Sequence, residues 1–312
     1  MRRNLPMVRA WLPVSALALL LALLLTGCAE KLDPEAAPPA GGISGNVPEN
    51  TPVISGMPVD GGSAAGQPSP LRALIVDGAE TGELVLAGER GVYDVYLLDA
   101  ASVPVLLDGE AADASALRGG MTVEIVLSGD IPASSPAELG EVESVSAYSI
   151  GSPESPGGTA YDLCGLYLQV LEDLWNKDPG LNDGAKYISV DLSAAPGGLS
   201  ESAKFAVAWA FAQRHGAQAL TLGYDELAAQ GYLTNDAPKG DEWAAYRWED
   251  GVLLRITARE WARDEIYSLP VVKFDAEKWR SALGAYFLQD CAAVWPEFGT
   301  WSGYTVGAEA IS

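Results

Sequence analysis

Two stretches that cannot form a core divide this chain into the parts that can fold. Residues 28–69 are rich in Pro, Gly, Ala and Ser and have almost no aromatic or large aliphatic side chains. Residues 151–158 repeat this composition over a shorter length. Such segments cannot bury enough apolar surface to offset the entropy of an ordered chain. We therefore expect a disordered tether at 28–69, a linker at 151–158, and folded domains at 70–150 and 159–312.

The residues before the tether have the three parts of a secretory signal. Three arginines precede an apolar run from Trp11 to Leu25, and small residues then lead to Cys28. The tetrapeptide Leu25-Thr-Gly-Cys28 resembles the lipobox of bacterial lipoproteins. The resemblance implies a lipoprotein signal peptide at 1–27 and a diacylglycerol thioether on Cys28, which anchors the protein to the extracytoplasmic face of the cell membrane. The alternative is an uncleaved membrane helix, because the apolar run is nearly long enough to span a bilayer.

The charge balance is strongly acidic. The chain has 19 basic and 42 acidic residues, and three of the basic ones precede Cys28. The remainder has 16 basic against 42 acidic residues, a net charge of −26. Such a surface repels phosphate backbones and anionic headgroups, so we expect no nucleic-acid partner. Solubility is the simplest benefit of this acidity.

The first domain has the pattern of a small β-barrel. In its clearest strand, Met121, Val123, Ile125 and Leu127 fall on one face and the polar residues Thr122, Glu124 and Ser128 on the other. Little in the domain predicts a helix, and the short runs recur at barrel-like spacing. The expected strands are 73–76, 83–86, 92–98, 103–107, 121–128 and 142–150.

The run from Leu117 to Leu139 is similar to part of an uncharacterised family of OB-like domains, found in secreted lipoproteins of Gram-positive bacteria. The positions that carry the resemblance are Gly120, Val123, Ile125, Gly129, Ile131, Pro136, Ala137 and Leu139. Leu127-Ser-Gly129 departs from the family's "Y-D-G" turn. The resemblance implies an OB-like fold and no established activity.

The second domain mixes helices and strands. Apolar residues at helical spacing predict a helix from Leu163 to Asn176. A strand at 186–192, a helix capped by Ser200 and ending at His215, and a strand at 217–222 predict a βαβ unit. Asp250-Gly251 predicts a hairpin turn between strands at 244–248 and 252–257. Further strands at 267–274, 284–294 and 301–306 complete an antiparallel sheet, so the class is α+β.

The stretch from Lys278 to Tyr286, with Trp301, Gly303 and Ile311-Ser312, resembles a second secreted domain of unknown function in the same group of lipoproteins. This resemblance implies a location at the cell envelope and no particular chemistry.

We expect no catalytic residue, metal or cofactor. His215 is the only histidine, and it falls in the last turn of a predicted helix, where a structural role is usual. The segment from Asp178 to Gly184 has residues found in calcium loops, but the twelfth position of an EF-hand would be Ser189 instead of Glu. No phosphate loop or nucleophile motif occurs, although paired carboxylates could serve a hydrolase.

Cys164 and Cys291 remain after Cys28 is assigned to the anchor. Disulfides persist outside the cytoplasm, so the two can form one bridge. Two buried free thiols are the alternative, since free Cys packs as a small hydrophobe.

The stretch from Arg247 to Arg280 favours a binding site. It has seven of the sixteen basic residues beyond Cys28, together with aromatic side chains, and Arg and Trp dominate binding hot spots. The alternative is an ordinary sheet with ion-paired exposed faces and a core of aromatic residues. The candidate ligand-binding residues are Trp248, Arg255, Trp261, Trp279, Arg280 and Tyr286.

Together these features predict a lipid-anchored binding or interaction protein of the cell envelope, without catalytic turnover. Expected partners are the membrane, through the lipid, and a cell-wall glycan, a peptide or another envelope protein. The alternatives are a carboxylate-based envelope hydrolase and a structural assembly factor.

Overall fold

The computed structural model describes residues 70–89, 91, 94–152, 162–235, 246–259, 262–263, 270–294, 301 and 303–312. The predicted signal peptide with Cys28, the tether, most of the linker and Trp261 lie outside these residues. The structure is 42% strand and 22% helix, which agrees with the α+β class. None of the described helices has the length and apolar character needed to cross a bilayer.

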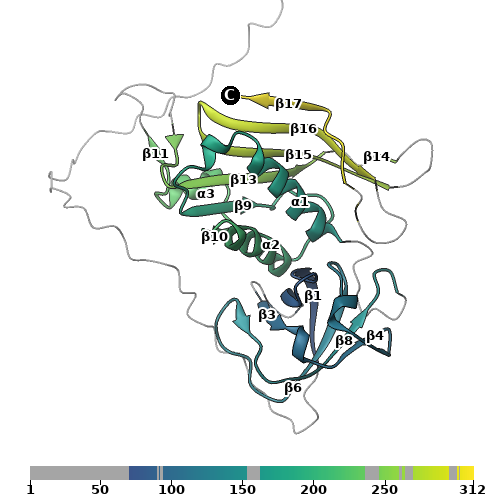
Figure 1. Ribbon diagram of the computed structural model, residues 1–312. Coiled ribbons are helices and arrows are strands. Elements are labelled where there is room, and N and C mark those ends of the chain that lie inside the picture. Colours follow the sequence, from purple (N-terminus) through teal and green to yellow (C-terminus); the bar gives the residue numbers. More distant parts are fainter. Residues whose placement is uncertain are drawn as a thin grey trace, which may run out of the picture. The chain divides into compact units, whose positions relative to one another are not determined.

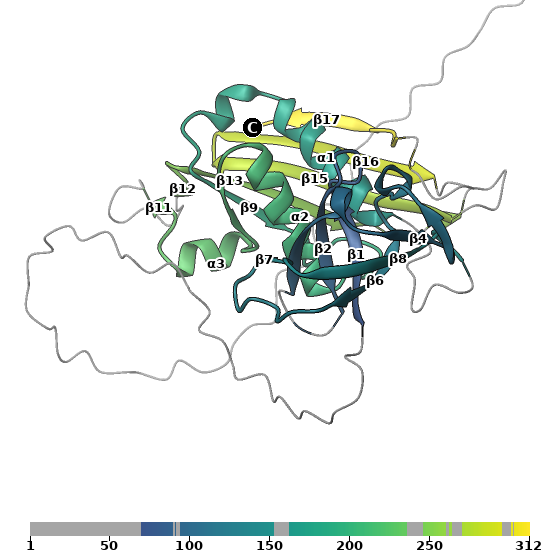
Figure 2. The ribbon, with the colours of Figure 1, turned by 60° about the horizontal axis from the view of Figure 1, so that its bottom comes forward.

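Residues 70–152 contain one curled sheet of eight strands (Figure 1, Figure 2). Its order is β5-β4-β8-β6-β1-β2-β3-β7. Neighbours are antiparallel, except that β4 pairs with β8, and β3 with β7, in parallel. The strands are β1 (Leu71–Asp77), β2 (Glu83–Gly88), β3 (Val95–Asp99), β4 (Val105–Leu107), β5 (Glu110–Ala112), β6 (Thr122–Leu127), β7 (Ala137–Glu138) and β8 (Val142–Tyr148).

Alternation explains which side chains fill this curled sheet. Val123 and Ile125 of β6 are fully buried in its interior, as the pattern predicted. Strands β1 to β3 differ, because they are apolar on both faces. Their outer residues Val76, Val85 and Val95 are also buried, in a cluster with the helices of the second half.

The second sheet has nine strands and is mixed. Its main path is β10-β9-β13-β15-β12-β11, while β14 and β16 also pair with β15, and β17 pairs with β16. The strands are β9 (Tyr187–Asp191), β10 (Gln218–Leu220), β11 (Thr234–Asn235), β12 (Tyr246–Arg247), β13 (Gly251–Ala258), β14 (Ala262–Arg263), β15 (Pro270–Ser281), β16 (Gly284–Val294) and β17 (Ala308–Ile311).

Helices α1 (Leu163–Asn176) and α2 (Glu201–Arg214) pack against this sheet (Figure 1). The prediction that α1 ends at Asn176 is confirmed. Ser200 caps α2 as predicted: its Oγ accepts a hydrogen bond from Ala203 N at 3.1 Å. Beyond α2, Gly216 has a φ of +64°, the left-handed conformation that ends many helices. Strands β9 and β10 flank α2 and pair in parallel, so the predicted βαβ unit is confirmed.

Helix α2 has almost no exposed face, and its sequence explains why. Five of the eleven residues from Ser202 to Ala212 are alanines, and residues around the whole circumference are buried. A helix that is apolar all round lies inside a protein. Here the second sheet and the outer face of β1, β2 and β3 share one cluster with it.

The predicted hairpin at Asp250-Gly251 is wrong. Strands β12 and β13 each pair with β15 and, in the described residues, not with each other. Gly251 is required for another reason: a Cβ atom there would lie 2.0 Å from Cε2 of Trp248. The glycine lets an indole pack onto the backbone, and the chain passes from β12 to β13 without reversing.

Candidate functional site

A groove of about 220 Å³ lies over β13, β15 and β16. It opens on the face of the second sheet opposite α1 and α2, because Leu254 and Ile256 of β13 pack against the helices while Arg255 and Thr257 alternate to the other face. The lining residues are Arg255, Thr257, Asp275, Ala276, Glu277, Phe287, Leu288 and Gln289.

The strand register aligns four side chains across this face. Arg255 on β13 is opposite Asp191 on β9 and Glu277 on β15. Glu277 is opposite Phe287 on β16. Cross-strand neighbours share one face of a sheet, so an acid, a base, an acid and an aromatic ring follow one another. The next row brings Thr257 opposite Asp275.

A β-bulge shapes the groove. The register of β15 and β16 shifts between Phe274 and Ala276, so Gln289 and Asp290 together oppose Asp275. Asp290 has a φ of +54°, a left-handed conformation that is uncommon for a residue with a side chain. Its backbone N–H donates to Asp275 Oδ1 at 2.8 Å. Bulges and such backbone strain are both concentrated near functional sites.

The charges around the groove are arranged in pairs. Arg255 forms an ion pair with Glu277, and their side chains are 41% and 18% exposed. Arg259 Nη1 lies 3.1 Å from Asp275 Oδ1 and also contacts Asp290. Exposed pairs of this kind add at most about 1 kcal/mol to stability. Their more specific effect is to hold two guanidinium groups and three carboxylates in fixed positions beside the groove.

The structure corrects the expectation that the tryptophan faces of this region are available to a ligand. Trp248 is fully buried and Trp279 is 8% exposed. Both belong to an aromatic layer with the helix α3 (Tyr224–Ala229), where the rings of Tyr224 and Trp279 meet edge to face with centroids 5.0 Å apart. The second interpretation of this stretch, an ordinary sheet with a core of aromatic residues, therefore describes the two tryptophans better than a binding site does.

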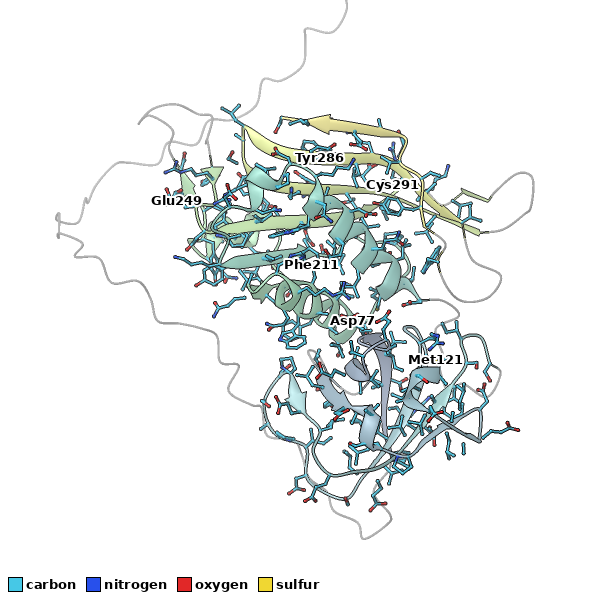
Figure 3. The ribbon with its side chains drawn as sticks, viewed as in Figure 1. Asp77, Met121, Phe211, Glu249, Tyr286 and Cys291 are labelled. Carbon is cyan, nitrogen blue, oxygen red and sulfur yellow. The ribbon has the colours of Figure 1, made fainter. Side chains whose placement is uncertain are left out.

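Arg280 and Tyr286 have structural contacts outside the groove. The Arg280 guanidinium donates to the backbone oxygens of Leu181, Asp183, Trp248 and Glu249, and so joins two loops. The Tyr286 ring packs on the helix side of β16, where Cys291 also lies (Figure 3), and its hydroxyl donates to Glu309. Of the predicted ligand residues within the described ranges, Arg255 alone lines the groove.

The segment from Asp178 to Gly184, whose spacing argued against an EF-hand, contacts an ammonium group. Lys278 on β15 is fully buried, and its Nζ donates to Asn182 Oδ1 at 3.1 Å. The backbone oxygens of Trp175, Lys177 and Asp178 accept from the same Nζ, so the lysine caps the end of α1. Burial lowers the pKa of Lys278 to about 8. In the described residues, no group of three or more His, Cys, Asp or Glu side chains is placed to hold a metal ion.

His215 follows the last turn of α2, where the sequence placed it. Its ring stacks on Trp175 with centroids 4.3 Å apart, and Nε2 lies 3.2 Å from Glu172 Oε2 without the geometry of a hydrogen bond. The packing supports a structural role for the ring.

Cys164 on α1 and Cys291 on β16 are both free, buried thiols. Burial raises the pKa of both groups, that of Cys291 to about 12. The sequence left a disulfide and two buried free thiols open, and the structure has the two free thiols.

Sequence reasoning missed Asp191, Thr257, Glu277, Phe287 and Gln289. Strict alternation in 251–258 and 270–277 could have separated Thr257 and Glu277 from the buried positions. Nothing local could have shown that β9, far away in the chain, is the neighbour of β13.

Comparisons of this chain with protein-family models, with curated proteins and with solved structures found no match.

Proposed function

We propose that this chain is a lipid-anchored, extracytoplasmic binding or interaction protein of the cell envelope, and that it binds its ligand in the groove over β13, β15 and β16. The groove beside the β-bulge carries this proposal. It combines a hollow with fixed charges, amide and hydroxyl groups and an aromatic side chain, the mixture that small binding sites use.

We also propose an OB-like barrel for residues 70–150. The strand order supports it when β7 and β8 together are matched to the fifth strand of an OB barrel. Strands β1, β2 and β3 are then consecutive neighbours, and β7 pairs in parallel with β3. Strands β8 and β6 complete the circuit to β1. OB domains commonly bind ligands on the face of strands 2 and 3. In this chain Val85 and Ala87 of β2 and Val95 of β3 are buried on that face with the helices. We therefore assign ligand binding to the second sheet.

The carboxylates near the groove support binding over hydrolysis. Glu277 is paired with Arg255, Asp275 with Arg259, and Asp191 accepts from both the N–H and the hydroxyl of Ser193. A catalytic acid and base would have to leave these partners to reach a substrate. A hydrolase would release new reducing ends or free amines from envelope material, which a colorimetric assay detects.

The anchor is tested by Cys28→Ala in the full chain, with Ser44→Ala in the tether as a control. We expect the control to be processed and diacylated, whereas the Cys28 variant stays at precursor mass. Detergent partition and mass spectrometry measure both. A diacylated Cys28→Ala protein would refute the anchor.

The groove is tested by Arg255→Gln, with Arg247→Gln as its matched control. Arg247 also forms an exposed ion pair, with Glu249, but on β12 away from the groove. We expect retention of the full chain on immobilised envelope fractions to fall for Arg255→Gln and to persist for Arg247→Gln. Equal retention of both variants would remove the groove from the binding function.

A further inference from the structure

We infer that the groove takes one neutral or amine-bearing sugar ring of a glycan; this inference rests on the binding function proposed above. Four properties of the groove lead to it: its size, the pairing of its floor, the chemistry of its side chains and its charge.

The size of the groove restricts the occupant to a small unit. Its volume is about 220 Å³. Pockets for drug-sized ligands have volumes of about 300–1,000 Å³. A single ring, as one unit of a longer chain that continues into solvent, matches this size better than a large compact ligand.

The floor of the groove offers no backbone for an extended peptide. Strand β15 is paired with β13 on one side and β16 on the other. Strand β16 is paired with β15 and, from Tyr286 to Gln289, with β17. Peptides that add to a sheet need unpaired backbone N–H and C=O groups. A ligand here must be recognised by side chains.

The side chains match hydroxyl and amide groups. Thr257 and Gln289 are exposed at the groove, and each can both donate and accept. Arg255 adds donors, and Glu277 adds acceptors. A sugar hydroxyl also donates and accepts, so it can bond to Thr257 and Gln289, and to Arg255 and Glu277 in addition to the ion pair between those two side chains. The Phe287 side chain, opposite Glu277, supplies apolar surface for the C–H face of a ring.

The charge of the lining argues against a polyanion. One arginine and two carboxylates, Arg255, Asp275 and Glu277, give the lining a net charge of −1. The whole chain has a formal net charge of −23. The negative charge of the lining and that of the whole chain both repel phosphate-rich or uronate-rich polymers. A neutral or amine-bearing sugar meets no such repulsion.

The experiment is a calorimetric titration of the full chain, purified in detergent. The probes are the trisaccharide of N-acetylglucosamine, which is neutral, trigalacturonate, which is anionic, and an uncapped alanine pentapeptide. The variants are Thr257→Val and Gln289→Ala. Gln218→Ala is the matched control, because Gln218 is an exposed glutamine on β10 of the same sheet and outside the groove.

We expect the neutral trisaccharide to bind, and each groove variant to raise its Kd roughly two- to tenfold, the effect of losing one hydrogen bond. Gln218→Ala should leave the Kd unchanged. Groove-dependent binding of the pentapeptide or of trigalacturonate in place of the neutral sugar would overturn the sugar inference and leave the binding function intact. Trisaccharide binding that ignores both variants would overturn the site. If none of the three probes binds, the sugar inference is overturned. If the wild-type chain is not retained on the immobilised envelope fractions, the binding function itself is overturned.

Discussion

Asp94, just before β3, donates its backbone N–H to the hydroxyl of Ser202 on α2 at 3.2 Å, across 108 residues of sequence. Ser202 is fully buried, and its Oγ also donates to Gly91 O at 2.7 Å. One hydroxyl therefore satisfies two backbone groups of the first half from the first turn of a helix in the second half. The same junction buries apolar side chains of β1, β2 and β3.

This junction predicts that a cut in the linker will not separate the two halves. Val76, Val85, Ala87 and Val95 are buried at the junction, and burying one valine-sized side chain is worth about 1.5–3 kcal/mol. After cleavage of an engineered protease site within 151–158, we expect both fragments to elute together in gel filtration. In denaturant they should separate. Two native fragments that elute apart would mean that the halves are independent, as linker composition alone suggests.

Asp162, the N-cap of α1, predicts a pH dependence of stability. Its Oδ1 accepts from Gly165 N at 2.8 Å, and burial, opposed by this hydrogen bond and reinforced by Asp77 and Glu80, raises its pKa from 3.8 to about 6. The folded state then holds the proton more tightly than the unfolded chain. The free energy of unfolding therefore falls as pH rises from about 4 to about 6, and stays low above that.

The substitution Asp162→Asn removes the fall in the free energy of unfolding with rising pH, and it keeps an N-cap acceptor. We expect the variant to exceed the wild type in unfolding free energy by on the order of 2 kcal/mol at pH 7.5. The difference should shrink toward pH 4, where the wild-type carboxyl is protonated. Urea titrations at both pH values measure it, and a variant less stable at pH 7.5 would contradict the raised pKa.

Lys278 predicts the opposite slope at alkaline pH. Burial lowers the pKa of its ammonium from 10.5 to about 8, so the unfolded chain binds this proton more tightly between those values. Its contribution to the free energy of unfolding therefore rises with pH across that window. Lys278→Met removes both the rise and the donor to the end of α1.

We expect Lys278→Met to lose about 2–4 kcal/mol at pH 7, because buried acceptors are left without a partner. Lys273→Met is the control, on the same strand but facing the other way, and should change stability by about 0.5 kcal/mol or less. Denaturant melts compare the two. Equal effects would show that the cap of α1 does not depend on the buried ammonium.

The free thiols of Cys164 and Cys291 predict a specific alkylation pattern. Both are buried with raised pKa values, so the native protein should react very slowly with iodoacetamide at pH 8. After denaturation without reductant, both should be alkylated, as mass spectrometry of peptides will record. A bridged peptide pair in that digest would establish the disulfide in place of the two thiols.

Local patterns were sufficient for the helices and for most strands. Apolar spacing predicted α1, and the Ser200 cap predicted the start of α2, because a capping hydroxyl acts within a few residues of the helix that it begins. The alternation of β6 predicted its buried face for the same reason. The βαβ unit also followed, since a strand, a helix and a strand of these lengths have few ways to pair.

The roles of particular residues needed the tertiary structure. Asp250-Gly251 has the local preference of a turn, but the packing of Trp248 onto Gly251 outweighs it. From the sequence alone, Lys278 would be expected to be an exposed charge, whereas in the structure it is buried beneath the end of α1. Trp248 and Trp279 read equally well as binding or core residues, and the aromatic layer over the sheet decided between them.

By itself, the sequence determined the α+β class, the helices and most strand positions, because these depend on contacts between near neighbours in the chain. Only the tertiary structure decided which strands lie beside one another, and therefore that Asp191, Arg255, Glu277 and Phe287 form one row. It also decided that β1, β2 and β3 bury their outer face with α2. Pairing between distant segments depends on the free energy of the whole core, and no window of sequence contains that quantity.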